Sequence, residues 1–175
     1  EAWDGAVEKE RNNFLLTRKY GADTANELSE GIKRVVAETP GDDSFLTSML
    51  SNASLQAKMT TQDLDAMANA IADYNIMSQA SGSTTFETEG EIRSYLMTGE
   101  TGRMKDTPLA PYLDKMEQAD TVTERVKVLN EALNELGYAG AAGMDTAGNS
   151  METFKGTMQQ ALANVGEIFL PIIKT

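Results

Sequence analysis

Apolar residues recur at three- and four-residue spacing through most of the chain, which is the spacing of one helical face. The clearest stripe follows Thr121, where spacings of 4, 3, 4 and 3 separate Val122, Val126, Leu129, Leu133 and Leu136. Thr121 and Glu124 have the pattern of a capping box, which satisfies two free amides at a helix start. Gly137 suits a left-handed helix end. The pattern therefore predicts a helix over 122–136.

Similar stripes predict further helices along the rest of the chain. The first covers residues 3–19, and the second is capped by Asp23 or Thr24 and ended by Thr39-Pro40-Gly41. Others start at Asp43 or Ser44, at Thr60 or Thr61, at Thr88, and at Thr107-Pro108. Alternation of polar and apolar residues is scarce, so no sheet is expected. We predict an all-α fold, an array of about seven to eight short amphipathic helices.

The glycine-containing stretches suggest how the chain is divided. Residues 98–107 contain two glycines and no apolar period, which predicts a mobile surface loop. We expect a helical domain over 1–137, with an alternative in which two lobes divide within 81–107. Residues 138–175 then form a Gly/Ala-rich link, flexible or closely packed, and a C-terminal amphipathic helix.

The C-terminal stretch, residues 150–175, carries two interleaved seven-residue apolar series. One contains Met151 and Val165, and the other contains Phe154 and Ile168. Pro171 should kink or end this helix, because proline has no amide proton. We expect its first half to pack on 122–136 and its second half to lead out of the domain into a longer protein. The candidates for facing a partner are Val165, Ile168, Phe169, Leu170, Pro171 and Ile172.

The amino-acid composition argues against several classes of function. The 15 basic and 27 acidic residues leave a net charge of −12, which argues against binding nucleic acid or an anionic membrane surface. No stretch has 18 successive apolar residues, so no membrane span is expected. The chain contains neither Cys nor His, which excludes a Ser–His–Asp triad and the usual zinc sites from it. We expect no catalytic residue, metal, cofactor or small-molecule ligand.

Three acidic or glycine-rich motifs have structural explanations. Glu87, Glu89 and Glu91 alternate, so on a helix they share no face, and we expect a solvated acidic helix start. Asp42-Asp43 and the stretch from Asp145 lack the ligand spacing of a calcium loop, and N-capping explains them better. Gly99 to Gly102 lacks the ending of a phosphate loop and is interpreted as a turn.

The C-terminal third resembles tail tape-measure proteins of long-tailed phages and prophages. A Gly/Ala-rich run, Gly137–Gly143, comes before Asp145-Thr146, Phe154-Lys155-Gly156, Asn164-Val165-Gly166-Glu167 and Phe169-Leu170-Pro171. That family has an amphipathic helix of this type after such a run, ending in an apolar-apolar-Pro turn. The recognisable pattern covers about residues 135–172. Residues 60–76 and 121–136 also look like the helical segments that come before it.

The resemblance implies a structural viral protein without catalytic residues in this region. Its partners would be other tail proteins or copies of itself, and its location would be the virion tail, after synthesis in the host cytoplasm. The family sets tail length and takes part in genome delivery. Two alternatives stay open. One is a non-viral helical adaptor with a Met-rich groove, and the less favoured one is a helical peptidoglycan hydrolase with dispersed carboxylates.

Overall fold

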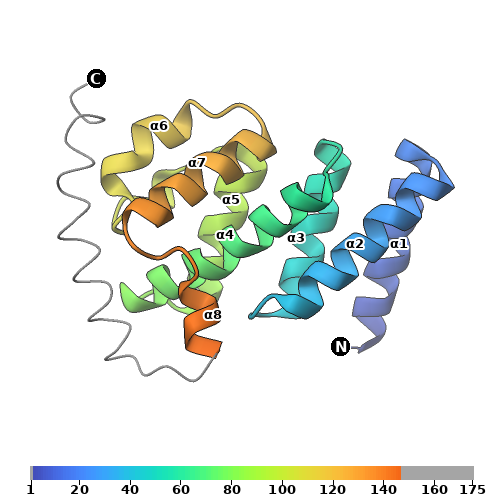
Figure 1. Ribbon diagram of the computed structural model, residues 1–175, viewed down its shortest axis with the longest axis horizontal. Coiled ribbons are helices and arrows are strands. Elements are labelled where there is room, and N and C mark those ends of the chain that lie inside the picture. Colours follow the sequence, from blue (N-terminus) through green and yellow to red (C-terminus); the bar gives the residue numbers. More distant parts are fainter. Residues whose placement is uncertain (1, 147–175) are drawn as a thin grey trace.

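The structure, a computed structural model that describes residues 2–146 and the side chains of residues 10–143, is all-α in that part (Figure 1). The α-helices are α1 Ala2–Tyr20, α2 Ala22–Glu38, α3 Asp43–Gln56, α4 Thr61–Ala80, α5 Thr85–Thr98, α6 Leu113–Glu117, α7 Val122–Glu135 and α8 Ala141–Thr146. Two 3-10 turns, η1 Gly102–Met104 and η2 Ala110–Tyr112, lie between α5 and α6. The predicted all-α class is confirmed, whereas the helix predicted over 150–175 lies outside the described residues.

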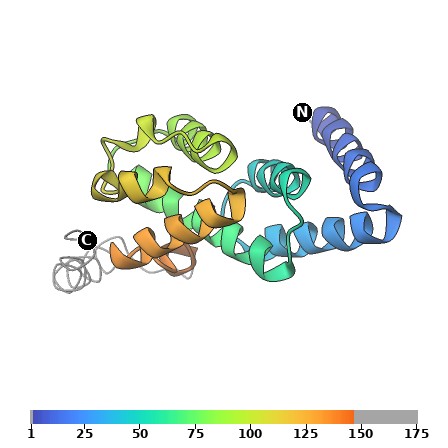
Figure 2. The ribbon, with the colours of Figure 1, turned by 90° about the horizontal axis from the view of Figure 1, so that it is seen from above.

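Helix α4 runs through the middle of the array. It packs against α2, α3, α5, α7 and α8. Two views show α1 and α2 at one end of the described part and α6 to α8 at the other (Figures 1 and 2). One core cluster joins residues from α1 to α8, with members both before residue 81 and after residue 107.

Burial extends around most of α4, beyond the single face that its apolar period predicts. The predicted positions Leu64, Met67, Ala68, Ile71 and Tyr74 are all buried. Ala70, Ala72 and Asp73 are buried as well, because helices pack on the other sides. Alanine allows this close packing, because its small side chain lets neighbouring helices approach α4 closely. A helix covered on all sides is typical of a core element.

Side-chain caps set the starts of α3, α4, α5 and α7. Thr60 with Asp63 and Thr84 with Glu87 form complete capping boxes at α4 and α5. The Thr121 hydroxyl accepts from the Glu124 amide at α7. In the predicted capping box the Glu124 carboxylate would accept from the Thr121 amide. It accepts instead from the amide of Asp120, one residue earlier.

Several helix boundaries differ from the prediction. The helix predicted to start at Thr107-Pro108 begins at Leu113, after the 3-10 turn η2. Helix α5 begins three residues before Thr88, since Thr84 provides the cap. Helix α2 has Gly21 at its N-cap position without a side-chain cap bond, so the predicted cap at Asp23 or Thr24 is wrong. Helix α3 starts at Asp43 as predicted and extends to Gln56, with Ser51, Ala53 and Ser54 facing the core and the Ser54 hydroxyl donating to the Leu50 carbonyl.

The predicted loop over 98–107 lies at the surface, as its mostly exposed residues show, but part of it is packed into the body. Its mobility stays a prediction. Thr101, Met104 and Thr107 are buried in it. The Arg125 guanidinium on α7 donates to the carbonyls of Leu96, Ala119 and Asp120, each at 3.2 Å. One side chain thereby joins the end of α5 and the segment before α7 to α7 itself. These contacts come from distant residues, which a local period does not reveal.

The Gly/Ala-rich stretch after α7 turns back onto the body. Gly137 and Gly140 have φ values of 84° and 79°, a left-handed conformation that favours glycine. Tyr138, Ala141 and Ala142 are buried, and α8 packs on α4. Of the two interpretations of this stretch, close backbone approach is therefore the one observed over 137–142.

Replacing Leu129 with Ala should lower the free energy of unfolding by roughly 2–5 kcal/mol, because the side chain is fully buried and its removal leaves a cavity. Urea unfolding followed by circular dichroism measures this. Lys127→Ala, on the exposed side of the same helix, should change stability by less than about 0.5 kcal/mol. Equal stabilities of the two variants would contradict the packing of α7 described above.

Candidate functional site

The six residues predicted to face a partner, Val165, Ile168, Phe169, Leu170, Pro171 and Ile172, lie outside the described residues. The described part offers other candidate features, namely carboxylates, buried polar groups, cavities and exposed apolar side chains.

The three alternating glutamates of α5 lie in three different environments. Glu87 accepts from the Thr84 amide and completes the helix cap. Glu89 is half-buried, and burial followed by the nearby Asp42 carboxylate raises its pKa. Glu91 is buried. The prediction that the three share no face is wrong for Glu87 and Glu91, which lie four residues apart on one side of α5, where the Glu87 charge adds to burial in raising the pKa of Glu91. The solvated position predicted for Glu91 is also wrong, because α4 covers that side of α5.

Glu91 belongs to a polar seam, which we define as Tyr74, Ser78, Thr88 and Glu91, between α4 and α5. The Ser78 hydroxyl donates to Glu91 Oε1 at 3.1 Å, and the Thr88 hydroxyl lies 3.0 Å from Ser78 Oγ. Burial, and then the Glu91 carboxylate, raises the pKa of Tyr74. Burial is also the largest cause that raises the pKa of Glu91.

The polar seam has the residue types of an acid–base site but lacks access for a substrate. Exposed fractions are 0% for Tyr74 and Ser78, 2% for Thr88 and 7% for Glu91. The hydrogen bonds among Ser78, Thr88 and Glu91 help to fix how the two helices pack. The buried Tyr74 hydroxyl, in contrast, has no hydrogen-bond partner among the described residues. A sequence signal exists for the seam, because Tyr74 and Ser78 lie four residues apart and Thr88 and Glu91 three apart. Polar residues at the three- or four-residue spacing of a buried helix face, on two successive helices, indicate a buried polar contact between those helices.

Asp73 is a second buried carboxylate that the sequence prediction missed. Its two oxygens accept from the amides of Gly140 and Ala142, at 3.1 and 3.2 Å. Burial raises the pKa of Asp73, while these two hydrogen bonds lower it. The available signal was a lone acid among the apolar residues of 70–77.

Asp42 and the Gly99 turn have the structural roles expected of them. Asp42 Oδ1 accepts from the amides of Ser44 and Phe45 at the start of α3, which is the predicted N-capping. Gly99 ends α5 in a left-handed conformation, which is the predicted turn. Among the described residues, no group of three acidic side chains is placed to hold a metal ion.

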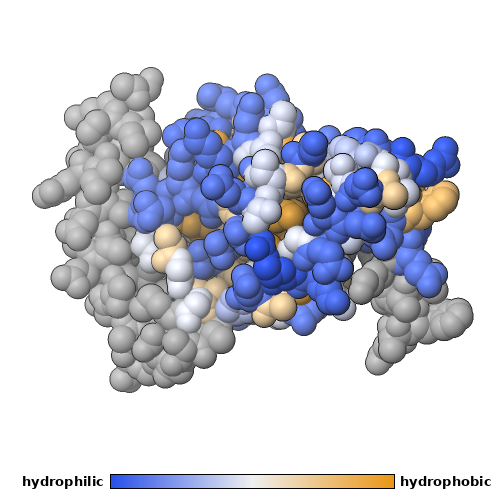
Figure 3. Space-filling view, turned by 45° about the vertical axis from the view of Figure 1, so that its right-hand side comes forward, coloured by the Kyte–Doolittle hydropathy of each residue, from blue (hydrophilic) through white to orange (hydrophobic). Residues whose placement is uncertain are grey.

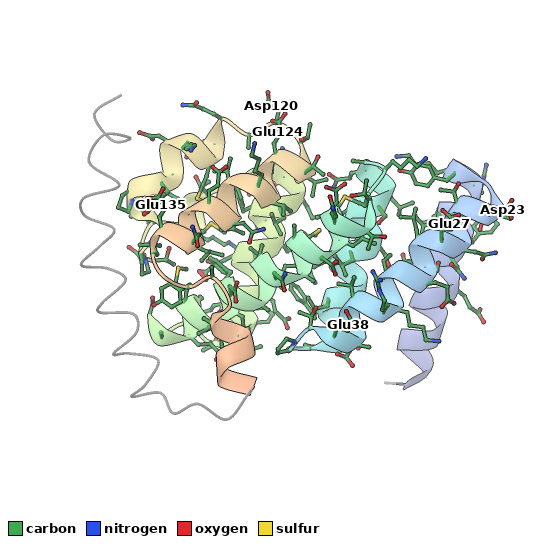
Figure 4. The ribbon with its side chains drawn as sticks, in the orientation of Figure 1. Asp23, Glu27, Glu38, Asp120, Glu124 and Glu135 are labelled. Atoms are coloured by element: carbon green, nitrogen blue, oxygen red, sulfur yellow. The ribbon has the colours of Figure 1, made fainter. Side chains whose placement is uncertain are left out.

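Six further carboxylates are spread over the molecule (Figure 4). Asp23, Glu27 and Glu38 lie on α2, and Asp120, Glu124 and Glu135 lie on or next to α7. These two sets come from opposite ends of the array. A glycosidase-type mechanism needs two carboxylates facing each other across a cleft. These carboxylates therefore give no support to the hydrolase alternative.

A groove between α1, α2 and α3 has a volume of about 330 Å³. The buried side chains of Leu16, Ile32 and Val36 contribute its apolar surface. Exposed polar residues, including Lys33 and Asp43, line it as well. A groove with this lining suits an apolar side chain of a partner better than a charged ligand.

A smaller cavity of about 160 Å³ lies where residues 40–42 meet α4 and α5. Apolar side chains such as Phe45, Ile71 and Ile92 line it together with Asn75 and Glu89. The Arg93 guanidinium lies over the Phe45 ring, 5.2 Å from its centroid. The cavity touches the polar seam only through Thr88, so it opens no route to Glu91.

Exposed apolar side chains are few and separate in the described part. Phe86 is 87% exposed at the first turn of α5, and Phe14 is 60% exposed on α1 with the Arg18 guanidinium over its ring. The face shown in Figure 3 is mainly hydrophilic, with small apolar areas between polar ones. Scattered residues of this kind are normal on a folded protein and do not by themselves mark an interface.

Mild acid should stabilise the domain. The pKa values of Asp73, Glu89, Glu91 and Glu135 are all raised in the folded state, mainly by burial. The folded state therefore binds protons at a higher pH than the unfolded state, and stability rises as pH falls toward the ordinary carboxyl values. The melting temperature should be higher at pH 5.5 than at pH 7.5, as measured by circular dichroism.

Glu91→Gln should make this pH dependence shallower, because it removes one of the buried titrating groups. Glu38→Gln is the matched control, since Glu38 is exposed on α2. A melting temperature that falls between pH 7.5 and 5.5, or equal slopes for the two variants, would contradict the burial of Glu91.

No helix in the described residues has the length and apolar character needed to cross a membrane. No family model, curated protein or solved structure matches this chain.

Proposed function

We propose that this chain is a structural domain of a tail tape-measure protein from a long-tailed phage or phage-like particle. The domain acts through helix packing with other tail proteins or with copies of itself during tail assembly and genome delivery. Its place is the virion tail, after synthesis in the host cytoplasm. No catalytic step, cofactor or small-molecule ligand belongs to this role.

The observation that carries the proposal is the sequence pattern after α7. A Gly/Ala-rich run, residues 137–143, comes before an amphipathic pattern that contains Asn164-Val165-Gly166-Glu167 and ends in Phe169-Leu170-Pro171. This order resembles the tape-measure family. The turn over 137–142 supports the proposal, because it packs the start of the pattern onto the helical body.

The use of the polar groups in the described part also supports a structural role. Asp42, Thr84 and Glu87 cap helices, and Asp73 and Glu91 form hydrogen bonds inside the packing. Side chains that serve as caps and seams are not free to bind or transform a substrate. The same carboxylates that a hydrolase would need are therefore committed to holding helices together.

A non-viral adaptor is the second candidate, and the groove between α1, α2 and α3 favours it. Its apolar lining from Leu16, Ile32 and Val36 suits a side chain of a partner helix. The groove provides the surface for such a partner but nothing that identifies it. The tape-measure proposal ranks first because the C-terminal pattern supports it specifically.

Purified tail particles from the strain that encodes this chain should contain it. Lys127 and Lys155 are successive basic residues, so trypsin releases residues 128–155 as one peptide. Mass spectrometry of gradient-purified tails should detect this peptide at a constant ratio to the major tail protein. Its presence in whole-cell extract and absence from purified tails would overturn the proposal and favour the adaptor.

The hydrolase alternative has a separate test. The purified chain should leave the turbidity of a bacterial cell-wall suspension unchanged, with lysozyme as the positive control. Clearing that is lost in the Glu91→Gln and Asp73→Asn variants would contradict the structural role.

A further inference from the structure

We propose that the outer face of α1 in one copy of this chain docks into the groove between α4 and α7 of a second copy. This face, which we call the α1 patch, consists of Arg11, Phe14, Leu15 and Arg18. The contact rests on the proposed function only for its place in an assembly. It is tested on the purified chain, so its failure would leave the tape-measure proposal standing.

The α1 patch has an apolar centre between two cations. Its four residues follow the spacing i, i+3, i+4 and i+7, so they lie on one helical face. All four side chains are exposed, Phe14 to 60% and Leu15 to 38%. Helix α1 packs on α2 and α3 through another face, which carries the buried Leu16. An exposed Phe14 alone would be ordinary, but here it belongs to a continuous surface with positive charge on both sides.

The groove between α4 and α7, the α4–α7 groove, combines an apolar floor with an acidic rim. Its volume is about 540 Å³, and Ala66 and Val126 contribute apolar surface to it. The charged residues that line it are three acids and one base: Asp63, Glu124, Glu131 and Lys127. The floor can receive an aromatic ring, and the rim attracts cations. The groove is therefore complementary to the α1 patch in charge and in polarity.

The charges of the two surfaces are spaced alike. Arg11 and Arg18 lie seven residues apart on α1, and Glu124 and Glu131 lie seven apart on α7. At about 1.5 Å per residue, each pair spans about 10 Å along its helix. Two helices lying side by side can therefore form both ion pairs at once, with the apolar centre of the patch between them. Glu131 also pairs with Lys115, but both side chains are about half exposed, so the carboxylate is open to a second cation.

The docking joins two copies, because the patch and the groove lie apart within one chain. Two views place α7 away from α1 (Figures 1 and 2). A symmetric contact between two α1 patches would bring the arginines of both copies together, and like charges in contact are unfavourable. The patch of one copy therefore meets the groove of the next, and each copy can bind a further copy through its other surface. A head-to-tail contact of this kind builds a ring or a filament.

Cross-linking between defined positions tests the docking, because the chain contains no cysteine of its own. A Leu15→Cys copy is mixed with a size-tagged Lys127→Cys copy at about 0.15 M salt, where a screening length of about 8 Å weakens the repulsion between two acidic chains. A short bifunctional maleimide should join them into a mixed dimer. Lys105→Cys, exposed and outside the groove, replaces Lys127→Cys as the control and should give much less mixed dimer.

Two outcomes of the cross-linking would overturn the docking. A yield no higher than that of the Lys105→Cys control would mean that something other than a second copy covers the α1 patch. A dimer formed by Leu15→Cys copies alone, in greater yield than the mixed dimer, would mean that two α1 patches meet symmetrically.

Charge reversal tests the pairing of the two surfaces. Arg11→Glu with Arg18→Glu should lower the mixed-dimer yield at least about tenfold, because like charges then face each other. Glu124→Lys with Glu131→Lys should do the same from the groove side. Mixing the patch variant with the groove variant should restore the yield, which would also show that both variants are folded.

The matched control reverses two exposed cations outside the α1 patch, Arg34→Glu with Lys105→Glu, and should leave the yield unchanged. An equal loss in this control would mean that only net charge matters. That result, or a mixture of the patch and groove variants that stays as low as either variant alone, would overturn the docking of the α1 patch into the α4–α7 groove.

Discussion

The structure depends on the enclosure of α4, which is covered by helices on nearly every side. Enclosure of this extent makes a buried polar group without a partner costly, since water is excluded, and most of the buried polar side chains on α4 have one, the Tyr74 hydroxyl being an exception. Ser78 therefore bonds to Glu91 and Thr88, and Asp73 bonds to the turn before α8. The buried polar contacts decide which helices can lie next to α4, whereas the alanines and methionines decide how closely they pack.

The sequence was most informative where a feature is local. The Thr121 cap, the stripe from Val122 to Leu136 and the stop at Gly137 all lie within one helix, and they were predicted closely. Glu91 and Asp73 were missed because their roles depend on α4 meeting α5 and α8. The burial of Thr101, Met104 and Thr107 was missed for the same reason, because it depends on how their segment packs against the body.

Few of the charged side chains in the described part form ion pairs. Lys115 and Glu131 form an ion pair at 3.4 Å, the only one among the described residues. Other cations serve different purposes, since Arg125 binds carbonyls and Arg93 covers the Phe45 ring. Much of the acidic excess is therefore left without a paired cation in that part. Close association between two copies would be opposed by this charge at low salt and favoured by screening.

The position of α1 at the edge of the array has a consequence for motion. It packs mainly on α2 and α3, whereas α4 has five neighbouring helices. Because α1 packs mainly on two helices at the edge of the array, it can separate locally while the helices around α4 stay packed. Because Leu16 on α1 lines the groove, its opening also widens that groove. The volume available to a partner is therefore a property of a fluctuating ensemble, largest in the states where α1 has partly left its place.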